Sequence, residues 1–214
     1  MQRLALLLRN LVYKNRRYIR PGNHIQLPTS SEQRLKKTTI KLRGSNNRLV
    51  IGENVTLTHC EIRLDGDNNL IEIGNDVRFS SGKIYLGGTT GQHIRIGADT
   101  TVEGAYLLVD EAASIDIGRD CMFSTEIIMR TGDKHSILDV ESGERVNRSR
   151  DIRIADRVWI GRDVTVLKGA VLHPETVVAT RSLVSSAFGE GECVVAGVPA
   201  RIVKRGVRWD RRLL

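Results

Sequence analysis

The sequence IGRDVTVLKGAVLHPETVVATRSL, residues 160–183, repeats an aliphatic residue every six positions. The repeat runs on in both directions without a slip, through Ile154, Ile160, Val166, Leu172, Val178 and Val184. Helices repeat about every 3.6 residues and strands every two, so a period of six fits neither. It indicates short flat segments stacked around a polygonal coil, with one apolar side chain pointing inward from each side. The stretch therefore predicts a solenoid.

The same architecture continues upstream with a longer period. Ile-Gly pairs recur at steps of 22, 23 and 21 residues, each after two strand-like segments joined by a corner rich in Gly, Asn and Asp. These pairs begin at Ile51, Ile73, Ile96 and Ile117. Three plain hexads would need fewer residues per coil. We therefore expect the extra residues at 44–47, 66–69 and 87–92 to bulge outward at one corner, where Gly and Asn tolerate positive φ.

Length and composition agree with one elongated domain. The chain has 214 residues, of which only 4% are aromatic, and a solenoid core is a narrow stack of aliphatic side chains. We expect an all-β fold with a solenoid over residues 38–200, interrupted by an inserted loop over 130–151. A short helical cap over 1–20 and a basic tail over 201–214 complete the expected organisation.

Positive charge is concentrated at the two ends of the chain. The formal net charge is +8, yet residues 1–20 hold six Arg or Lys and no acid, and residues 201–214 hold six with one acid. On a helix, the N-terminal basic residues would flank an apolar stripe, which suits a cap on the solenoid or contact with an anionic membrane face. The cap is the favoured interpretation because solenoids need caps. No nucleic-acid-binding module is recognisable, so we expect no nucleic-acid partner.

The cysteines and the hydropathy favour the cytoplasm. Cys60, Cys121 and Cys193 are odd in number and far apart, which favours buried reduced thiols over disulfides or metal ligands. No apolar run approaches the ~20 residues that span a bilayer, and the apolar stretch at 4–8 is short for a signal peptide. We expect a cytoplasmic protein, with the inner face of the membrane as a place of peripheral contact.

The chain resembles the hexapeptide-repeat acyltransferases over about residues 40–204. Besides the hexads, VWIGRDVTVLKGA from Val158 is similar to the family's VWIG segment, and AGVPARIVK from Ala196 is similar to the aGnPAkvik signature that ends the helix. The resemblance implies a left-handed parallel β-helix assembled as a homotrimer with active sites between subunits. Ala155 replaces the Gly of an Ile-Gly pair and Val198 replaces the usual Asn, and both changes are mild.

The only large break in the repeat lies between Met129 and Ile152 and contains His135. Long loops in compact proteins are commonly functional. Acyl transfer from a thioester to an alcohol requires deprotonation of the attacking hydroxyl, and imidazole titrates near neutral pH. The resemblance implies a catalytic histidine in a D-x-H stretch at this position, which Asp133-Lys134-His135 matches. His135 is therefore the predicted general base, and the other four histidines are expected to pack at surfaces and corners.

A carboxylate partner for the imidazole is less clearly marked. Asp133 would either orient the ring and stabilise its cation or serve only as a loop carboxylate. Asp139 and Glu141 are rivals for the same role.

The resemblance also implies that acetyl-coenzyme A lies along the coils between subunits, as acyl donor. Trp159 resembles the aromatic residue that walls the thioester end, with packing at a coil corner as the alternative. Gly161, Ala179 and Thr180 would line the groove, Lys168 would flank it, and Arg181 and Lys204 would contact phosphates. This chain reads ATRSLV where relatives commonly read GAGSVV, which weakens the transfer of those contacts. No metal is expected.

These expectations favour an acetyl-coenzyme A-dependent O-acetyltransferase. The short chain, the insertion and the basic termini are similar to enzymes that modify capsular and other cell-surface polysaccharides, including polysialic acid. A small sugar, a nucleotide-linked amino sugar or an antibiotic is the alternative acceptor. A zinc carbonic anhydrase would need three converging histidines, and only His135 is well placed. A scaffolding β-helix would have no need of His135.

Overall fold

The computed structural model describes residues 13–214. The helix expected over 1–20 therefore lies largely outside the described residues. Where it can be checked, it is wrong: Arg16–Ile19 form a β-strand that pairs in parallel with Thr39–Leu42. The solenoid thus begins about twenty residues before the expected start at 38, because a first coil with few aliphatic residues precedes the recognisable repeats.

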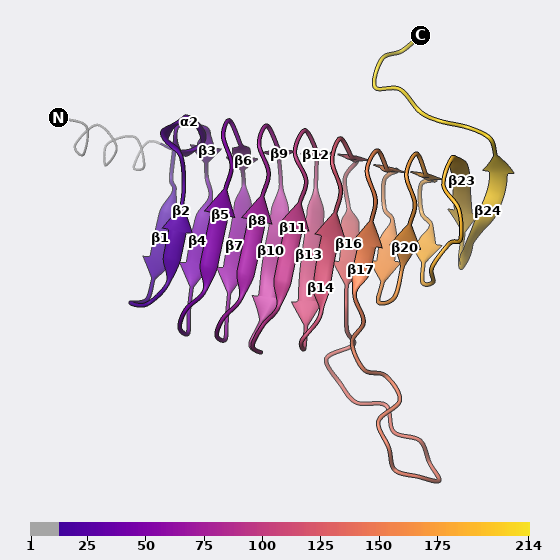
Figure 1. The fold of residues 1–214 in the computed structure, drawn as a ribbon, viewed down its shortest axis with the longest axis horizontal. Helices are drawn as coiled ribbons and strands as arrows, with labels where there is room; N and C mark the ends of the chain where they lie inside the picture. Colours follow the sequence, from indigo (N-terminus) through magenta and orange to yellow (C-terminus); the bar gives the residue numbers. More distant parts are fainter. Residues whose placement is uncertain (1–12) are drawn as a thin grey trace.

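Three sheets form the walls of a parallel β-helix (Figure 1). Sheet A has eight strands, β1 (Arg16–Ile19), β4 (Thr39–Leu42), β7 (Cys60–Leu64), β10 (Gly82–Gly87), β13 (Ala105–Asp110), β16 (Ile127–Arg130), β19 (Thr165–Leu167) and β22 (Leu183–Val184). Sheet B has seven, β2 (His24–Gln26), β5 (Arg48–Ile51), β8 (Leu70–Ile73), β11 (His93–Ile96), β14 (Ser114–Ile117), β17 (Ile152–Ile154) and β20 (Val171–Leu172). Sheet C has nine, β3 (Leu35–Lys36), β6 (Thr56–Thr58), β9 (Arg78–Phe79), β12 (Thr101–Val102), β15 (Met122–Phe123), β18 (Trp159–Ile160), β21 (Val177–Val178), β23 (Cys193–Gly197) and β24 (Ala200–Arg205). The short helix α2 (Thr29–Glu32) lies between β2 and β3. The predicted all-β solenoid is confirmed.

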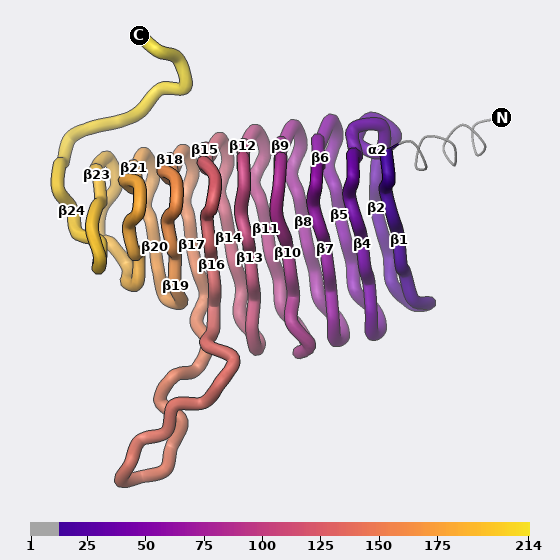
Figure 2. Tube along the Cα trace, turned by 180° about the vertical axis from the view of Figure 1, so that it is seen from behind, coloured from indigo at the N-terminus to yellow at the C-terminus, as the bar shows by residue number. Residues whose placement is uncertain are grey.

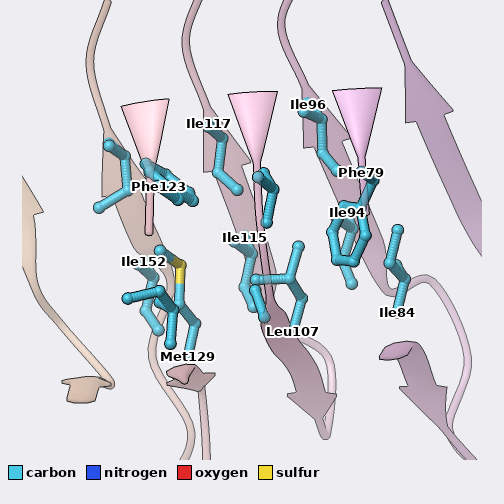
Figure 3. Close-up of a cluster of buried hydrophobic side chains, with 14 of the residues drawn as sticks. Phe79, Ile84, Ile94, Ile96, Leu107, Ile115, Ile117, Phe123, Met129 and Ile152 are labelled. Atoms are coloured by element: carbon cyan, nitrogen blue, oxygen red, sulfur yellow. The ribbon is translucent and has the colours of Figure 1, made fainter. Parts of the chain in front are cut away.

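Side chains alternate between the core and the surface along each strand, as in β7, where Cys60, Ile62 and Leu64 are buried and the residues between them are not. Parallel pairing in register stacks equivalent residues of successive coils above one another, so that Ile62 lies beside Ile84. Figure 3 shows the resulting column of aliphatic side chains, with Phe79 and Phe123 among the largest buried members. This column is the single core that the hexads predict.

The Ile-Gly pairs reflect the close stacking of coils at the corner between sheets B and C. A Cβ atom on Gly97 would lie 2.5 Å from the carbonyl carbon of Gly118 in the next coil, closer than packed atoms can approach. Glycine is required there by the neighbouring backbone.

The corner between sheets A and B holds a ladder of buried amides. The backbone N–H of Asn69 donates to Asn47 Oδ1 at 3.0 Å, and that of Gln92 donates to Asn69 Oδ1 at 2.8 Å. The Asn69 side chain in turn donates to the carbonyls of Asp65 and Thr89. The predicted bulges exist, with positive φ at residues such as Gly66 and Asn68, but their last residue turns inward and joins one coil to the next.

The C-terminal end of the solenoid is closed by an antiparallel pair. Strands β23 and β24 form a hairpin, so residues 201–205 of the expected tail are part of the sheet. The remaining residues run back along the outside of the coils (Figures 1 and 2). Trp209 anchors them: it is only 6% exposed, and its Nε1 donates to the Arg157 carbonyl at 2.7 Å.

Candidate functional site

One long loop, residues 131–151, interrupts the solenoid between β16 and β17 and projects from it (Figure 1). It leaves from the corner between sheets A and B, the corner that carries the amide ladder in earlier coils. Its two arms are joined by an antiparallel bridge between Leu138 and Arg145. The predicted insertion over 130–151 therefore matches the structure to within one residue at its start.

The two arms are held together by Asn147, a residue that the sequence did not single out. Its side chain is buried and its Nδ2 donates to Asp133 Oδ2 and to the carbonyl of His135, both at 2.8 Å. Its Oδ1 accepts from the N–H of Ile137 at 2.8 Å and from Arg145 Nε at 3.1 Å. A single asparagine thus fixes the backbone on both sides of His135.

Asp133 belongs to this brace and does not contact the imidazole. Its carboxylate also accepts a hydrogen bond from Lys168 Nζ, which in addition donates to the Asn147 carbonyl at 3.0 Å. The bond from Lys168 lowers the pKa of Asp133, with a further contribution from Asn147. Within residues 13–214 the His135 ring has no hydrogen-bond partner, and the residue is exposed. Lys168, expected to flank the donor groove, ties the loop to the coil beneath it.

The two rival carboxylates, Asp139 and Glu141, both lie at the tip of the loop. Asp139 Oδ1 accepts from the backbone N–H groups of Glu141 and Ser142 and from the Ser142 hydroxyl, which lowers the pKa of Asp139. Glu141 is exposed.

The second arm is anchored to the preceding coil through Glu111. Its carboxylate accepts from the backbone N–H of Ser149 at 2.8 Å and forms an ion pair with Arg145. These bonds, the one from Ser149 first, lower the pKa of Glu111 to about 2. The sequence carried one signal for this anchor, since the corner at 111–113 is shorter than those before it and lacks their Gly and Asn.

The other predicted donor-site residues lie elsewhere on the chain. Gly161, Thr180 and Arg181 lie at the corner between sheets C and A, at the opposite end of the sheet A strands from the loop, and Ala179 adjoins them. A Cβ on Gly161 would lie 2.8 Å from the Thr180 nitrogen, so the coils touch there. These positions are consecutive along one edge, as a groove along the coils requires.

The cations predicted to bind phosphates are both exposed. Arg181 lies 3.4 Å from Asp163, and its side chain is 82% exposed. Lys204 is exposed on β24. Within one chain, therefore, only Lys168 of the predicted donor-site residues reaches the loop that carries His135.

Trp159 projects from sheet C and is 38% exposed. Its ring lies 6.3 Å from that of Trp209, centroid to centroid, at an interplanar angle of 51°. The C-terminal segment thus supports one side of the indole. Sequence reasoning missed this contact because the two residues are fifty positions apart and Trp209 lies beyond the repeats.

Neither a metal-binding cluster nor a membrane-spanning helix is found among residues 13–214. No group of three or more His, Cys, Asp or Glu side chains is arranged there to hold a metal ion. None of the helices in that range has the length and apolarity to cross a bilayer. Cys60, Cys121 and Cys193 are free and buried, as predicted.

A parallel β-helix of hexapeptide coils, interrupted by one histidine-bearing loop, defines the class of hexapeptide-repeat acyltransferases. No protein-family model matches the chain. Among solved structures it is similar to the polysialic acid O-acetyltransferase OatWY, with a TM-score of 0.88 and 33% identity over 94% of this chain and 92% of that one. The polysialic acid-specific acetyltransferase NeuO follows, with a TM-score of 0.78 and 31% identity over 92% of this chain and 85% of that one. The chain therefore belongs to the family of hexapeptide-repeat acetyltransferases that includes these two proteins.

Curated relatives carry the same description. The chain is 34% identical over 123 residues to the polysialic acid O-acetyltransferase of Escherichia coli O1:K1, and 33% identical over 120 residues to that of Neisseria meningitidis. These matches cover 58% and 56% of this chain but 40% and 56% of the relatives. The chain thus spans about half the length of the curated relatives it matches.

Proposed function

We propose that this protein is an acetyl-coenzyme A-dependent O-acetyltransferase that modifies hydroxyl groups of an anionic cell-surface polysaccharide such as polysialic acid. The observation that carries the proposal is its likeness to OatWY over nearly the whole of both chains, at 33% identity. The structure adds a histidine on a loop whose backbone is fixed by Asn147.

His135 is the general base in this mechanism. The acceptor hydroxyl loses its proton to the imidazole as its oxygen attacks the thioester carbonyl carbon. The tetrahedral oxyanion then collapses, the carbon–sulfur bond breaks, and the imidazolium returns the proton to the departing thiolate. A ring that no neighbour engages within residues 13–214 is free to accept that proton.

Asp133 supports His135 through the loop. Its bonds to Asn147 and Lys168 hold the turn on which the histidine sits. We therefore assign Asp133 a positioning role.

The donor site lies between subunits of a homotrimer in this proposal. Gly161, Ala179, Thr180 and Arg181 are at the far end of the sheet A strands from His135, so a single chain leaves the two halves of the site apart. The loop of a second copy supplies the missing half. Trp159 then lies at the thioester end and Lys204 near the phosphates of coenzyme A.

A complementation experiment tests this arrangement. Trimers of His135→Ala alone and of Trp159→Ala alone are expected to be inactive or nearly so. Mixed trimers of the two variants should regain part of the activity, because some interfaces then carry both intact residues. Mixtures with no more activity than the separate variants, or an active monomer in sedimentation, would overturn the shared site.

A thiol-release assay tests the function itself. Acetyl-coenzyme A is supplied with polysialic acid, with neutral polysaccharides, and with small sugars and amino sugars. Release that depends on polysialic acid and collapses in His135→Ala supports the proposal, and His24→Ala, an exposed histidine on β2, is the matched control. Release that responds only to small sugars would assign a different acceptor, and release that survives His135→Ala would move the base elsewhere.

We place the protein in the cytoplasm, where acetyl-coenzyme A is available. Its three free and buried thiols suit a reducing compartment.

A further inference from the structure

The outward face of sheet A changes character along the solenoid axis. Strand register places its exposed side chains in two rows, one from Arg16 to Leu183 and one from Tyr18 to Leu167. From β13 onward the rows carry mainly apolar or neutral side chains, such as Tyr106 and Ile128. In the first four coils, by contrast, they carry charged and aromatic side chains.

Cations outnumber acids on the charged part of this face and its adjoining corner. We call this surface the basic face. Among the described residues it holds eight cations, namely Arg16, Arg20, Lys41, Arg43, Arg63, Lys83, Arg130 and Lys134. It holds four acids, Glu61, Asp65, Asp67 and Asp110, while Glu111 and Asp133 of the same corner are paired with Arg145 and Lys168. The eight cations exceed the four acids by four charges, half of the net charge of +8.

The uncompensated charge lies at the end away from the loop. Glu61 pairs with Lys41 at 2.8 Å and with Lys83 at 3.5 Å, while Asp65 lies 2.9 Å from Arg63 Nε. Arg16, Arg20 and Arg43 form no ion pair within residues 13–214. Together with Tyr18 they line an open hollow of about 560 Å³.

The other end of the basic face reaches the base of the catalytic loop. Lys134, next to His135, lies 5.5 Å from the centroid of the Tyr85 ring and 3.9 Å from Asp110. Arg63 and Lys83 lie over the same ring at 5.0 and 4.9 Å. The face is therefore continuous from the hollow to the loop.

We propose that the basic face is an extended binding track for the anionic polysaccharide acceptor, leading it from the hollow at Arg20 and Arg43 to His135. Adjacent parallel strands lie ~4.8 Å apart, so one coil after another offers a cation at short intervals to a polymer with a carboxylate on successive sugars. Exposed tyrosines offer flat apolar surfaces to the sugar rings. The inference rests on the proposed function and assigns the acceptor a surface remote from the reacting hydroxyl.

The test removes charge from the far end of the basic face. Arg20→Gln combined with Arg43→Gln eliminates two cations that form no ion pair within residues 13–214, at the corner farthest from His135 along this face. Arg48→Gln combined with Arg78→Gln is the matched control, because these exposed arginines lie on sheets B and C and have no ion-pair partner among the described residues. Polymer binding is measured directly with labelled polysialic acid, and KM is measured for long and very short oligosialic acids.

The track predicts a length-dependent effect. Arg20→Gln/Arg43→Gln should raise the dissociation constant and KM for the long polymer about tenfold, since charge-assisted hydrogen bonds are lost, while kcat and KM for the short acceptor stay unchanged. The control pair should change these values less than twofold. Added salt should weaken long-polymer binding more in wild type than in the variant, because exposed charges are screened.

Several outcomes would overturn the track. Equal shifts for both variant pairs would show a response to net charge alone, and an equal rise in KM for long and short acceptors would place the arginines at the reacting end. A change in sedimentation without a change in polymer binding would show that the face packs against another copy. Polymer binding that depends on Arg20 and Arg43 without any acetyl transfer would leave the track standing and refute the proposed function.

Discussion

The coils before the loop and the coils after it solve the same stacking problem in different ways. Before the loop, corners of five residues between sheets A and B carry buried amides that join one coil to the next, as at 43–47 and 65–69. After it, the corner at 168–170 has three residues, and the step from β19 to β22 is that of a plain hexad coil. The change occurs one coil before the loop, because the corner at 111–113 already has three residues and no Asn or Gln.

Buried amides have different roles in the coils and in the loop. The ladder of Asn47, Asn69 and Gln92 is buried. Asn47 and Asn69 each donate to one carbonyl of their own coil and one of the next, and Gln92 Nε2 donates to two carbonyls of the next coil. The Asn147 side chain in the loop is bound instead to the carbonyl of His135, the N–H of Ile137 and the side chains of Asp133 and Arg145, around an exposed histidine. The same chemical group therefore maintains the fold in one place and aims a side chain in the other.

The largest effect is expected from His135→Ala. Loss of a general base typically costs about 10²–10⁴ in rate, so kcat should fall by that factor. Because His135 is exposed and its ring has no partner within residues 13–214, the melting temperature should stay within about 1 °C of wild type. An activity assay checks the fall in kcat, and calorimetry on the same samples checks the melting temperature. A large loss of stability would mean that the loop contributes to the fold and would break the comparison.

A substitution in the amide ladder is expected to lower stability and leave kcat unchanged. Asn69→Ala leaves the Gln92 N–H and the carbonyls of Asp65 and Thr89 without their partner, at about 1–3 kcal/mol for each unsatisfied buried group. We expect a loss of about 3 kcal/mol, or roughly 6–12 °C in Tm, because a chain of this size loses about 2–4 °C per kcal/mol. The exposed neighbour Asn68, changed to Gly to keep its positive φ, is the control and should have little effect. Reduced kcat in folded Asn69→Ala at low temperature would contradict a purely structural role.

Much of this comparison was predictable from the sequence, because the spacing of its apolar residues follows the coils of the fold. The hexads and the Ile-Gly pairs located the coils, and the break after Met129 located the loop. The first coil was missed because Arg16–Ile19 has no buried residue, and its sheet membership comes from pairing with β4. Local composition cannot report a strand whose stability comes from its neighbour.

The candidate site was predictable only in part, for a related reason. His135 stood out by its place in the sole long insertion, whereas Asn147 is one polar residue among many in that loop. Its role depends on how the two arms meet. Asp133 was expected either to orient the imidazole or to serve as a loop carboxylate, and the structure shows it bound to Lys168, thirty-five residues away. Contacts across such distances follow from the coil geometry and leave no trace in the spacing.

Asn147→Ala should sharpen the contrast with Asn69→Ala. It removes the donors to Asp133 and to the His135 carbonyl, so the histidine should lose its fixed position, and kcat should fall about tenfold, the size of one net hydrogen bond. KM for acetyl-coenzyme A and Tm should change little. Ser142→Ala, which alters only the loop tip, is the control and should leave kcat unchanged. Equal losses from both variants would show that general loosening of the loop, and not the support of His135, determines the rate.

The smallest effect concerns the anchor of the loop at Glu111. Its pKa is lowered to about 2 by the Ser149 N–H and by Arg145, below the unfolded value of about 4.3. A carboxylate with a depressed folded-state pKa contributes stability above the unfolded pKa and loses it as the pH falls through the folded value. The difference in Tm between wild type and Glu111→Gln should therefore be constant at neutral pH and shrink between about pH 4.3 and pH 2. Because the side chain is 36% exposed, solvent screening should keep the effect below about 1 kcal/mol. Glu144→Gln is the control, because the Glu144 carboxylate forms no ion pair within residues 13–214, and its difference in Tm from wild type should not shrink on acidification. If the Tm difference for Glu111→Gln grew as the pH fell, Glu111 would not be held as an anion.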